Sequence, residues 1–190
     1  DCDYLLHIAS PFTIEEPKKD SLLINPALEG TLRALNAANN SSKIKKVVVT
    51  SSMAAIAYGH DKNICSPEDW TDLTKDVGAY VKSKTIAEKA AWDFIHSDKE
   101  RSFSMTTIHP GMVFGPLLSD DIDGASAELI SKMINGKFPA LPNAYLTVVD
   151  VRDVARLHVE SLKNHKSDNK RIIATSPKGI NIMEISNLLR

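Results

Sequence analysis

One stretch decides the predicted fold: Lys45-Lys46-Val47-Val48-Val49-Thr50-Ser51-Ser52. Three consecutive valines are typical of a strand that is buried on both faces, as the strands of parallel sheets are. The hydroxyl-bearing residues come at the carboxyl end of this strand, which is where open α/β sheets bind their ligands. A Ser/Thr turn that satisfies its own backbone has the same composition, so this stretch alone does not distinguish a ligand site from a turn.

A second stretch, Ala79-Tyr80-Val81-Lys82-Ser83-Lys84-Thr85-Ile86-Ala87-Glu88-Lys89, carries a phenol and an ammonium one helical turn apart. A helix places Tyr80 and Lys84 on one face. A tyrosine hydroxyl titrates near ~10, and an adjacent ammonium favours the phenolate and lowers that pKa. The pair alone also fits a solvated helix face. Together with the strand and its hydroxyls, it indicates a site for proton transfer.

The remaining pattern alternates between helices and strands, which predicts an α/β fold with a doubly wound parallel sheet. Tyr4 to Ile8 is an apolar strand, and Asn25-Pro26 indicates a helix cap followed by proline at the first helical position. Further elements are expected as a helix from Ala79 to His96, a strand from Ser104 to His109, a helix from Ala125 to Asn135, a strand from Leu146 to Val149, a helix after the cap Asp150 and a strand from Arg171 to Ala174.

Composition excludes several classes of protein. The chain has 190 residues, of which 43% are hydrophobic and 25% charged, as in an ordinary globular domain. With a formal net charge of -1, the chain lacks the excess of positive charge that binding to nucleic acid or an anionic membrane requires. No run of apolar residues is long enough to span a bilayer. Cys2 and Cys65 form neither a metal spacing nor a disulfide framework, which favours a reducing, cytoplasmic compartment. Asp120 and Asp121 invite a metal interpretation, but solvated loop charges explain them better, and no metal site is expected.

Several ordered motifs resemble those of the extended short-chain dehydrogenase/reductase superfamily, also called the NAD-dependent epimerase/dehydratase superfamily. Within it, the chain is most similar to the dihydroflavonol reductase-like group, which includes fungal aldehyde and ketone (methylglyoxal-type) reductases. The motifs are Tyr4 to Pro11, Val47 to Ser52, Ala79 to Lys84, His109 to Pro116 and Val148 to Ala155. The resemblance therefore spans nearly the whole chain.

The resemblance implies a set of site residues. Ser52, Tyr80 and Lys84 correspond to the catalytic residues of the family. Ser52 is preferred to Ser51 because neighbouring strand positions face opposite sides, although both hydroxyls stay possible on sequence alone. The expected cofactor contacts are Ala9, Ser10 and Pro11 after the first strand, Tyr80 and Lys84 on the helix, Pro110 and the backbone amide of Val113 in a turn against the nicotinamide, and Ser126 at a cofactor phosphate.

The resemblance also implies how the chain is organised. A dinucleotide fold opens with a strand, a glycine-rich turn and a helix, and no such turn precedes Tyr4. Tyr4 to Ile8 corresponds to about the fourth strand of the family's sheet. We therefore expect residues 1–190 to be a single truncated NAD(P)-binding Rossmann-like domain from the middle of a longer enzyme. A small discontinuous substrate lobe is expected from about 114–142 and 175–190.

The expected activity is reduction of an aldehyde or ketone to an alcohol by hydride transfer, with Tyr80 as general acid, Ser52 bound to the carbonyl oxygen and Lys84 holding the cofactor ribose. The resemblance favours NADPH, and NAD stays possible because the discriminating residues are absent. An apolar substrate surface is predicted from the residues after Ser52, which are Met53, Ala54, Ala55, Ile56 and Ala57, and from those after Pro110, which include Met112, Val113 and Phe114. A nucleotide-sugar epimerase or dehydratase shares the three catalytic residues, although dehydratases usually carry an acidic residue soon after the serine. A cofactor-sensing protein without turnover is a further alternative. The protein is expected to be a monomer or homodimer.

Overall fold

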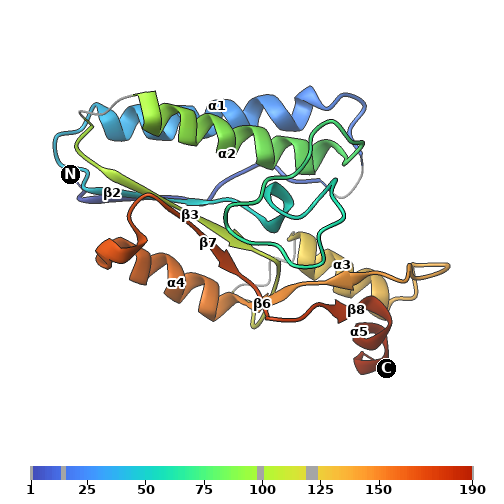
Figure 1. Ribbon diagram of the computed structural model, residues 1–190. Coiled ribbons are helices and arrows are strands. Elements are labelled where there is room, and N and C mark those ends of the chain that lie inside the picture. The colour runs from blue at the N-terminus through green and yellow to red at the C-terminus, as the bar shows by residue number, and fades with distance from the viewer. Residues whose placement is uncertain (1, 14–15, 98–100, 119–123, 190) are drawn as a thin grey trace. The chain divides into compact units, whose positions relative to one another are not determined.

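The computed structural model describes residues 2–13, 16–97, 101–118 and 124–189. They form two compact units, of which the first comprises Asp1–His109 and Leu157–Ile173 and the second Pro110–Arg156 and Ala174–Arg190. In chain order (Figure 1) the elements are β1 (Tyr4–His7), α1 (Ser21–Asn39), β2 (Lys46–Thr50), the 3-10 helix η1 (Met53–Ala55), α2 (Ala79–Ser97), β3 (Ser104–Pro110), β4 (Met112–Phe114), α3 (Ala125–Ile134), β5 (Tyr145–Leu146), β6 (Val148–Asp150), α4 (Val151–Lys163), the 3-10 helix η2 (His165–Ser167), β7 (Lys170–Ala174), β8 (Ile180–Asn181) and α5 (Ile182–Leu188).

The first unit is built on a sheet in the order β1-β2-β3-β7. The strand β2 runs parallel to both of its neighbours, with Val48 opposite Leu6 on one side and Thr106 on the other. Parallel neighbours require a crossover, and α1 and α2 provide the two crossovers. The prediction of an α/β, Rossmann-like parallel sheet is therefore confirmed.

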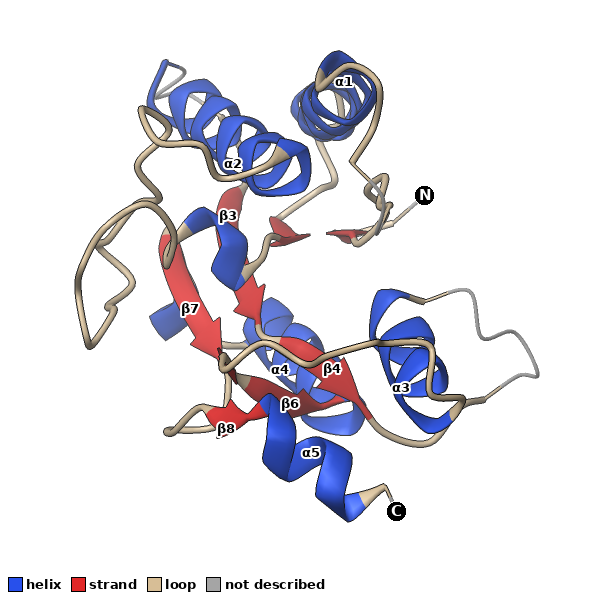
Figure 2. Ribbon diagram, turned by 90° about the vertical axis from the view of Figure 1, so that its right-hand side faces the viewer, coloured by secondary structure: helices blue, strands red, loops and turns tan. Residues whose placement is uncertain are grey.

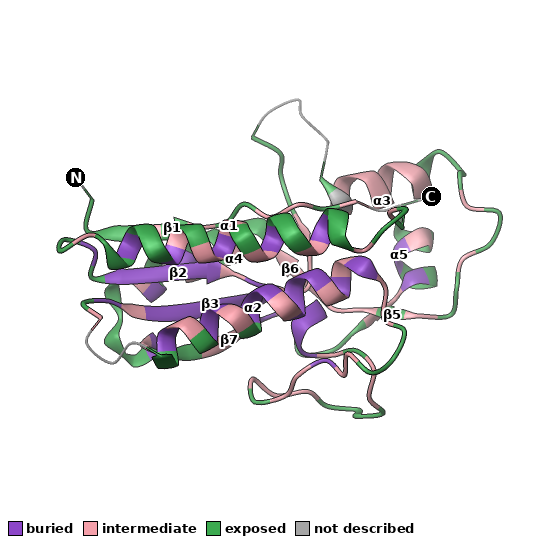
Figure 3. Ribbon diagram, turned by 90° about the horizontal axis from the view of Figure 1, so that it is seen from above, coloured by how far each residue is buried: buried purple, intermediate pink, exposed green. Residues whose placement is uncertain are grey.

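Helices α1 and α2 pack against each other on one face of this sheet, and the part of α4 from Leu157 onward lies on the other face (Figure 1). Val47 and Val48 are fully buried, as the triple valine predicted. Figure 3 shows buried positions along β2 and on the inner sides of both helices. Each buried valine or leucine contributes roughly 1.5–3 kcal/mol. The core between helices and sheet consists of Leu35, Ala38, Ile44, Val47, Val49, Ala91, Trp92, Ile95, Phe103 and Met105.

Helix α1 begins earlier than the sequence predicted. It starts at Ser21, with Asp20 at the N-cap position, so that Pro26 lies inside the helix instead of at its first position. Leu23 precedes Ala27 by one turn, and both side chains are buried on the same face. Burial of Leu23 therefore draws the preceding turn into the helix and offsets the backbone hydrogen bond that Pro26 cannot donate.

The second unit contains two small sheets, β4 with β6 and β5 with β8. Figure 2 shows β4 and β6 side by side, and Val113 pairs with Val149 in this parallel ladder. The predicted turn from Pro110 to Pro116 is therefore wrong, because β3 extends to Pro110 and β4 begins directly after Gly111. A side chain at Gly111 would collide with the carbonyl oxygen of Thr147, so the close strand approach needs glycine.

The predicted strand from Leu146 to Val149 is also divided. Its first part pairs in an antiparallel ladder as β5, with Leu146 opposite Ile180, and its second part pairs in a parallel ladder as β6. The predicted substrate-lobe segments, 114–142 and 175–190, belong to the second unit, and their role in substrate binding stays a prediction. The predicted loop at Asp120 and Asp121 lies outside the described residues. Among the helices of the described chain, none has the length and apolar character that crossing a bilayer requires.

Candidate active site

The three predicted catalytic residues all lie in the first unit. Ser52 comes shortly after the end of β2, and Tyr80 and Lys84 lie in the first two turns of α2. The backbone of Ser52 is extended (φ -160°, ψ 156°), and its hydroxyl accepts a hydrogen bond of 3.1 Å from the backbone N–H of Ala54. This bond caps η1 and fixes the direction of the serine side chain.

Ser51 and Ser52 have different partners, which separates the two hydroxyls that the sequence left open. The buried Ser51 hydroxyl donates a hydrogen bond of 2.6 Å to Oε2 of Glu88. The Ser52 side chain instead interacts with the Tyr80 hydroxyl. This arrangement favours Ser52 as the serine that shares a site with the phenol.

Tyr80 is half-buried, and its ring meets the ring of Phe12 edge to face, with the centroids 5.0 Å apart. Burial raises the pKa of the phenol, the hydrogen-bonding interaction with Ser52 lowers it, and Tyr58 raises it further. The net shift of the pKa is upward, opposite to the lowering that the sequence predicted from Lys84. The phenol is therefore protonated at neutral pH, which is the form that a general acid requires.

Lys84 carries a charge that is removed from solvent. The residue is only 9% exposed, and desolvation lowers the pKa of its ammonium to about 8, although the Glu88 charge acts in the opposite direction. Its Nζ lies 6.0 Å from the centroid of the Tyr80 ring. Among the described residues, no hydrogen bond or ion pair to this ammonium is found. Because this ammonium has no such partner and is not one of the fully buried polar atoms, it is accessible to a ligand from the pocket that Lys84 lines.

A small pocket brings some of the predicted cofactor contacts together. Ala9, Ser10 and Lys84 line it, whereas Pro11 does not. The other lining residues are His7, Thr31, Val49, Thr50, Ser51, Ala87 and Glu88. Small side chains at positions 9 and 10 leave their backbone accessible, and the ammonium offers donors to hydroxyl oxygens. Contact of Ala9, Ser10 and Lys84 with the ribose of a cofactor stays a prediction.

The other three predicted cofactor contacts belong to the second unit. Pro110 is buried at the end of β3, Val113 lies in β4, and Ser126 is half-buried in the first turn of α3. The N-terminus of α3 is preceded by Gly124 in extended conformation, without a side-chain cap. Contact of these three residues with a cofactor stays a prediction.

Sequence reasoning missed Glu88, the most highly connected side chain near the site. Its buried carboxylate accepts hydrogen bonds from five side chains: Ser51 (2.6 Å), Trp92 (3.1 Å), Thr107 (3.1 Å), His109 (2.8 Å) and Arg171 (2.8 Å). Burial raises its pKa, but the hydrogen bonds and charges of His109 and Arg171 outweigh burial and lower the pKa to about 2. One signal was available, because Glu88 lies one helical turn beyond Lys84.

The segment between Ser52 and α2 is held to the core by Arg171. Its Nη1 donates to the carbonyl oxygens of Pro67 (2.5 Å) and Asp69 (2.6 Å), and its guanidinium lies 3.7 Å from the centroid of the Trp70 ring. These contacts anchor the acidic, tryptophan-containing stretch from Glu68 to Asp72. The expectation that Ala54, Ala55 and Ile56 face a substrate is wrong, because all three are buried in the core. The other residues expected on that surface are half-buried, and their contact with a substrate stays a prediction: Met53, Ala57, Met112, Val113 and Phe114.

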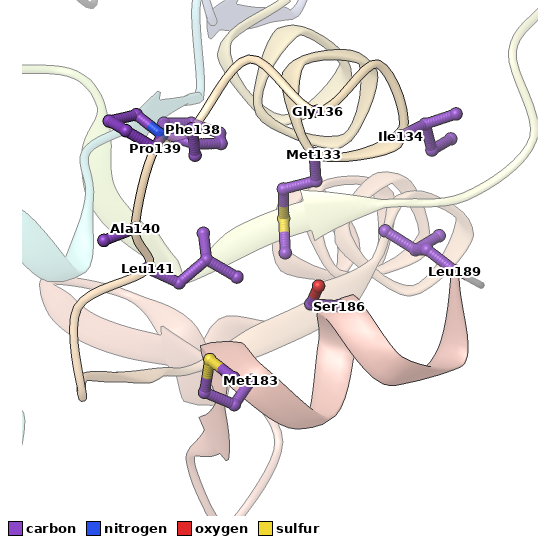
Figure 4. A pocket seen from close by; sticks show the side chains of 10 residues that line it. All are labelled: Met133, Ile134, Gly136, Phe138, Pro139, Ala140, Leu141, Met183, Ser186 and Leu189. Atoms are coloured by element: carbon purple, nitrogen blue, oxygen red, sulfur yellow. The ribbon is translucent and has the colours of Figure 1, made fainter.

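A pocket whose lining side chains are mostly apolar lies within the second unit (Figure 4). It is enclosed by α3, the segment after α3 and α5. Its lining residues are Met133, Ile134, Gly136, Phe138, Pro139, Ala140, Leu141, Met183, Ser186 and Leu189. All ten belong to the segments that the sequence assigned to a substrate lobe. Within the described part of the chain, no group of three or more His, Cys, Asp and Glu residues is arranged to hold a metal ion.

Comparison with known proteins connects this site to a family. Cinnamoyl-CoA reductase of Medicago truncatula is 38% identical over 179 residues, which cover 90% of this chain and 53% of that protein. The NADPH-dependent methylglyoxal reductase of Saccharomyces cerevisiae is 31% identical over 199 residues, with 94% and 57% covered. The crystal structure of the yeast methylglyoxal/isovaleraldehyde reductase complexed with NADPH superposes with a TM-score of 0.86 at 29% identity, covering 96% of this chain and 58% of the other.

The chain thus spans a little over half the length of the curated relatives it matches. The family model for the NAD dependent epimerase/dehydratase family matches residues 1–175, which include Ser52, Tyr80 and Lys84. The match covers both the parallel sheet of the first unit and most of the second unit. On these grounds the chain belongs to the NAD-dependent epimerase/dehydratase family.

Proposed function

We propose that the full-length protein reduces aldehyde and ketone carbonyls to alcohols with NADPH. The observation that carries this proposal is the arrangement on α2, where a protonated phenol and a buried ammonium lie one turn apart. Ala9 and Ser10 lie in the same pocket as the ammonium. The relatives support the choice of reaction and cofactor, because the yeast relative is an NADPH-dependent methylglyoxal reductase.

Each side chain has a defined role in this reaction. When bound, the reduced nicotinamide supplies the hydride. Tyr80 donates its phenolic proton to the carbonyl oxygen as negative charge develops there, and Ser52 donates a hydrogen bond to the same oxygen. Lys84 binds ribose hydroxyls, and its charge stabilises the phenolate that forms on Tyr80 once the proton has left. The raised pKa of the phenol keeps the acid form populated at neutral pH before transfer.

The second unit contains a pocket whose lining side chains are mostly apolar. Side chains that line its pocket include Met133, Phe138, Leu141 and Met183. Apolar pockets discriminate weakly, by about 1–3 kcal/mol per methylene, so we expect broad tolerance among small and aromatic carbonyl compounds. A nucleotide-sugar substrate would need cationic or hydrogen-bonding side chains for its diphosphate, and among the ten side chains that line this pocket one is polar, that of Ser186.

The test is a panel of aldehydes, diketones, dihydroflavonols and UDP-sugars with the full-length protein, monitored by NADPH absorbance. We expect oxidation of NADPH with aldehydes and diketones, and none in the Tyr80→Phe variant. Turnover confined to UDP-sugars would instead identify an epimerase or dehydratase, and cofactor binding without turnover of any compound would identify a cofactor-sensing protein.

We further infer that the protein acts in the cytoplasm as a monomer or homodimer. Cys2 and Cys65 are both free thiols, which suits a reducing compartment. Sedimentation of the full-length protein determines the oligomeric state, and a fluorescent fusion in intact cells determines the compartment.

A further inference from the structure

Glu88 joins three neighbouring strands to the helix that carries the proposed proton donor. Ser51 adjoins the end of β2, Thr107 and His109 belong to β3, and Arg171 belongs to β7, and all four donate to the same carboxylate. The carboxylate is almost completely buried, at 2% exposure. Because the donors come from separate strands, they fix both the rotation and the height of α2 over the sheet.

The contact with Ser51 reaches the proposed active site directly. The backbone N–H of Ser51 donates to the carbonyl oxygen of Ile108 (2.8 Å), while its hydroxyl donates to Glu88 (2.6 Å). Main chain and side chain of Ser51 are thus both held, and the next residue is Ser52. The direction in which Ser52 leaves the strand is therefore set in part by Glu88.

Glu88 also acts on Lys84 through its charge. The two residues are one turn apart and line the same pocket. The negative charge of Glu88 raises the pKa of the Lys84 ammonium, against the effect of burial. The other titratable groups around this ammonium are Tyr80 on α2 and His7 on β1. Burial and the Lys84 charge both lower the pKa of His7, so it is neutral and does not stabilise the ammonium.

Building on the function proposed above, we propose that Glu88 is a positioning residue. Its carboxylate holds the helix that carries Tyr80 and Lys84 against the strand end that carries Ser52, and it supplies the negative charge that keeps the Lys84 ammonium protonated. Arg171 and His109 keep the carboxylate ionised inside the protein. Glu88 touches no reacting atom and acts only through Ser51 and Lys84.

The first experiment needs neither cofactor nor turnover. Side-chain NMR of labelled lysine measures the titration of Lys84, whose signal is identified by its loss in Lys84→Arg. We expect Glu88→Gln to lower the pKa of Lys84, because the stabilising negative charge is gone. Asp93→Asn is the matched control, since Asp93 is an exposed acidic residue on the same helix and its loss changes the net charge equally. An unchanged Lys84 titration in folded Glu88→Gln overturns the electrostatic half of the proposal.

The second experiment does not depend on whether Glu88→Gln folds. Ser51→Ala and Thr106→Val each remove one buried hydroxyl, but only the Ser51 hydroxyl donates to Glu88, whereas that of Thr106 donates to the carbonyl oxygen of Ser167. We expect Ser51→Ala to lower kcat roughly 10- to 100-fold with little change in the KM for NADPH, and Thr106→Val to leave kcat within about 2-fold. Equal losses in both variants would reduce Glu88 to a structural residue. Absence of carbonyl turnover in the wild type would refute the proposed function, while the lysine titration would still decide the electrostatic role.

Discussion

Two successive turns of α2 each carry a charged residue, Lys84 and Glu88, and the two residues differ in their hydrogen-bond partners. Around Lys84, the ammonium borders a pocket, and no hydrogen bond or ion pair to it is found among the described residues. Around Glu88, the carboxylate accepts hydrogen bonds from five side chains and has its pKa lowered to about 2. Both residues are buried, since Lys84 is 9% exposed and Glu88 is 2% exposed. The difference teaches that a fully partnered buried charge holds separate elements of the fold together, whereas an ammonium without such partners at a pocket is free to bind a ligand, as proposed for Lys84.

The largest effect is expected on catalysis, from a substitution of Tyr80 in the turn of α2 that leads to Lys84. Tyr80→Phe removes the proposed proton donor and keeps the ring that packs against Phe12. We expect kcat to fall on the order of 100- to 10,000-fold, with the affinity for NADPH nearly unchanged. Steady-state kinetics and calorimetry of the full-length protein measure the two quantities. Retention of more than half the rate would remove Tyr80 from the mechanism.

The next largest effect is expected on stability, from the loss of a hydrogen-bond partner of Glu88. Arg171→Ala leaves the buried Glu88 carboxylate with one cationic partner fewer and releases the anchor of Pro67 and Asp69. Breaking a buried ion pair costs roughly 3–5 kcal/mol, so we expect a loss of this size in the free energy of unfolding in urea. A loss below about 1 kcal/mol would show that this network contributes little.

The hydrogen bonds of Glu88 also predict that the folded state loses stability in acid. The folded-state pKa of Glu88, about 2, lies below its ordinary value of 4.5. The stabilisation is therefore complete above pH 4.5 and is lost as the pH falls toward 2. The unfolding free energy of the wild type should fall over this range more steeply than that of Arg171→Ala, in which the lowering of the pKa is smaller.

The features of this site that depend on the spacing of residues close in sequence could be predicted from the sequence. Three valines specified a buried parallel strand, and a turn of helix placed Tyr80 and Lys84 on one face. The partners of Glu88 could not be predicted, because Arg171 and His109 are distant in sequence and reach the carboxylate only when β3 and β7 align. Pairing of Val113 with Val149 was missed for the same reason. The direction of the Tyr80 pKa was wrong because burial, which opposes the phenolate, cannot be read from spacing.

Substitution of Lys84 is expected to raise the unfolding free energy by a moderate amount, whereas substitution of Arg171 lowers it. Its folded-state pKa, about 8, lies below the ordinary value of 10.5, so the charged form costs the folded state stability. Below pH 8 the full cost is present; it declines between pH 8 and 10.5, where the folded state releases its proton first. We expect Lys84→Met to raise the unfolding free energy at about pH 7 by roughly 2–3 kcal/mol while abolishing NADPH binding. The difference from wild type should shrink as the pH rises toward 10.5. A variant less stable than wild type at neutral pH would contradict the assignment of Lys84 as a residue kept for its ligand.

The smallest effect is expected where an ion pair has good geometry but no burial. Arg33 and Glu29 on α1 are 2.7 Å apart, close to the 2.8 Å between Arg171 and Glu88. Their side chains are 78% and 56% exposed, against 10% and 1% for the buried pair. Water and salt screen the exposed charges, and the side chains lose entropy on pairing, so such pairs contribute about 0.3–0.5 kcal/mol. Arg33→Ala should therefore change the unfolding free energy by no more than about 0.5 kcal/mol, and raising the salt concentration should abolish even that. If Arg33→Ala and Arg171→Ala cost the same in one urea series, distance and not burial would decide what an ion pair contributes here, and the contrast between the two turns of α2 would lose its physical basis.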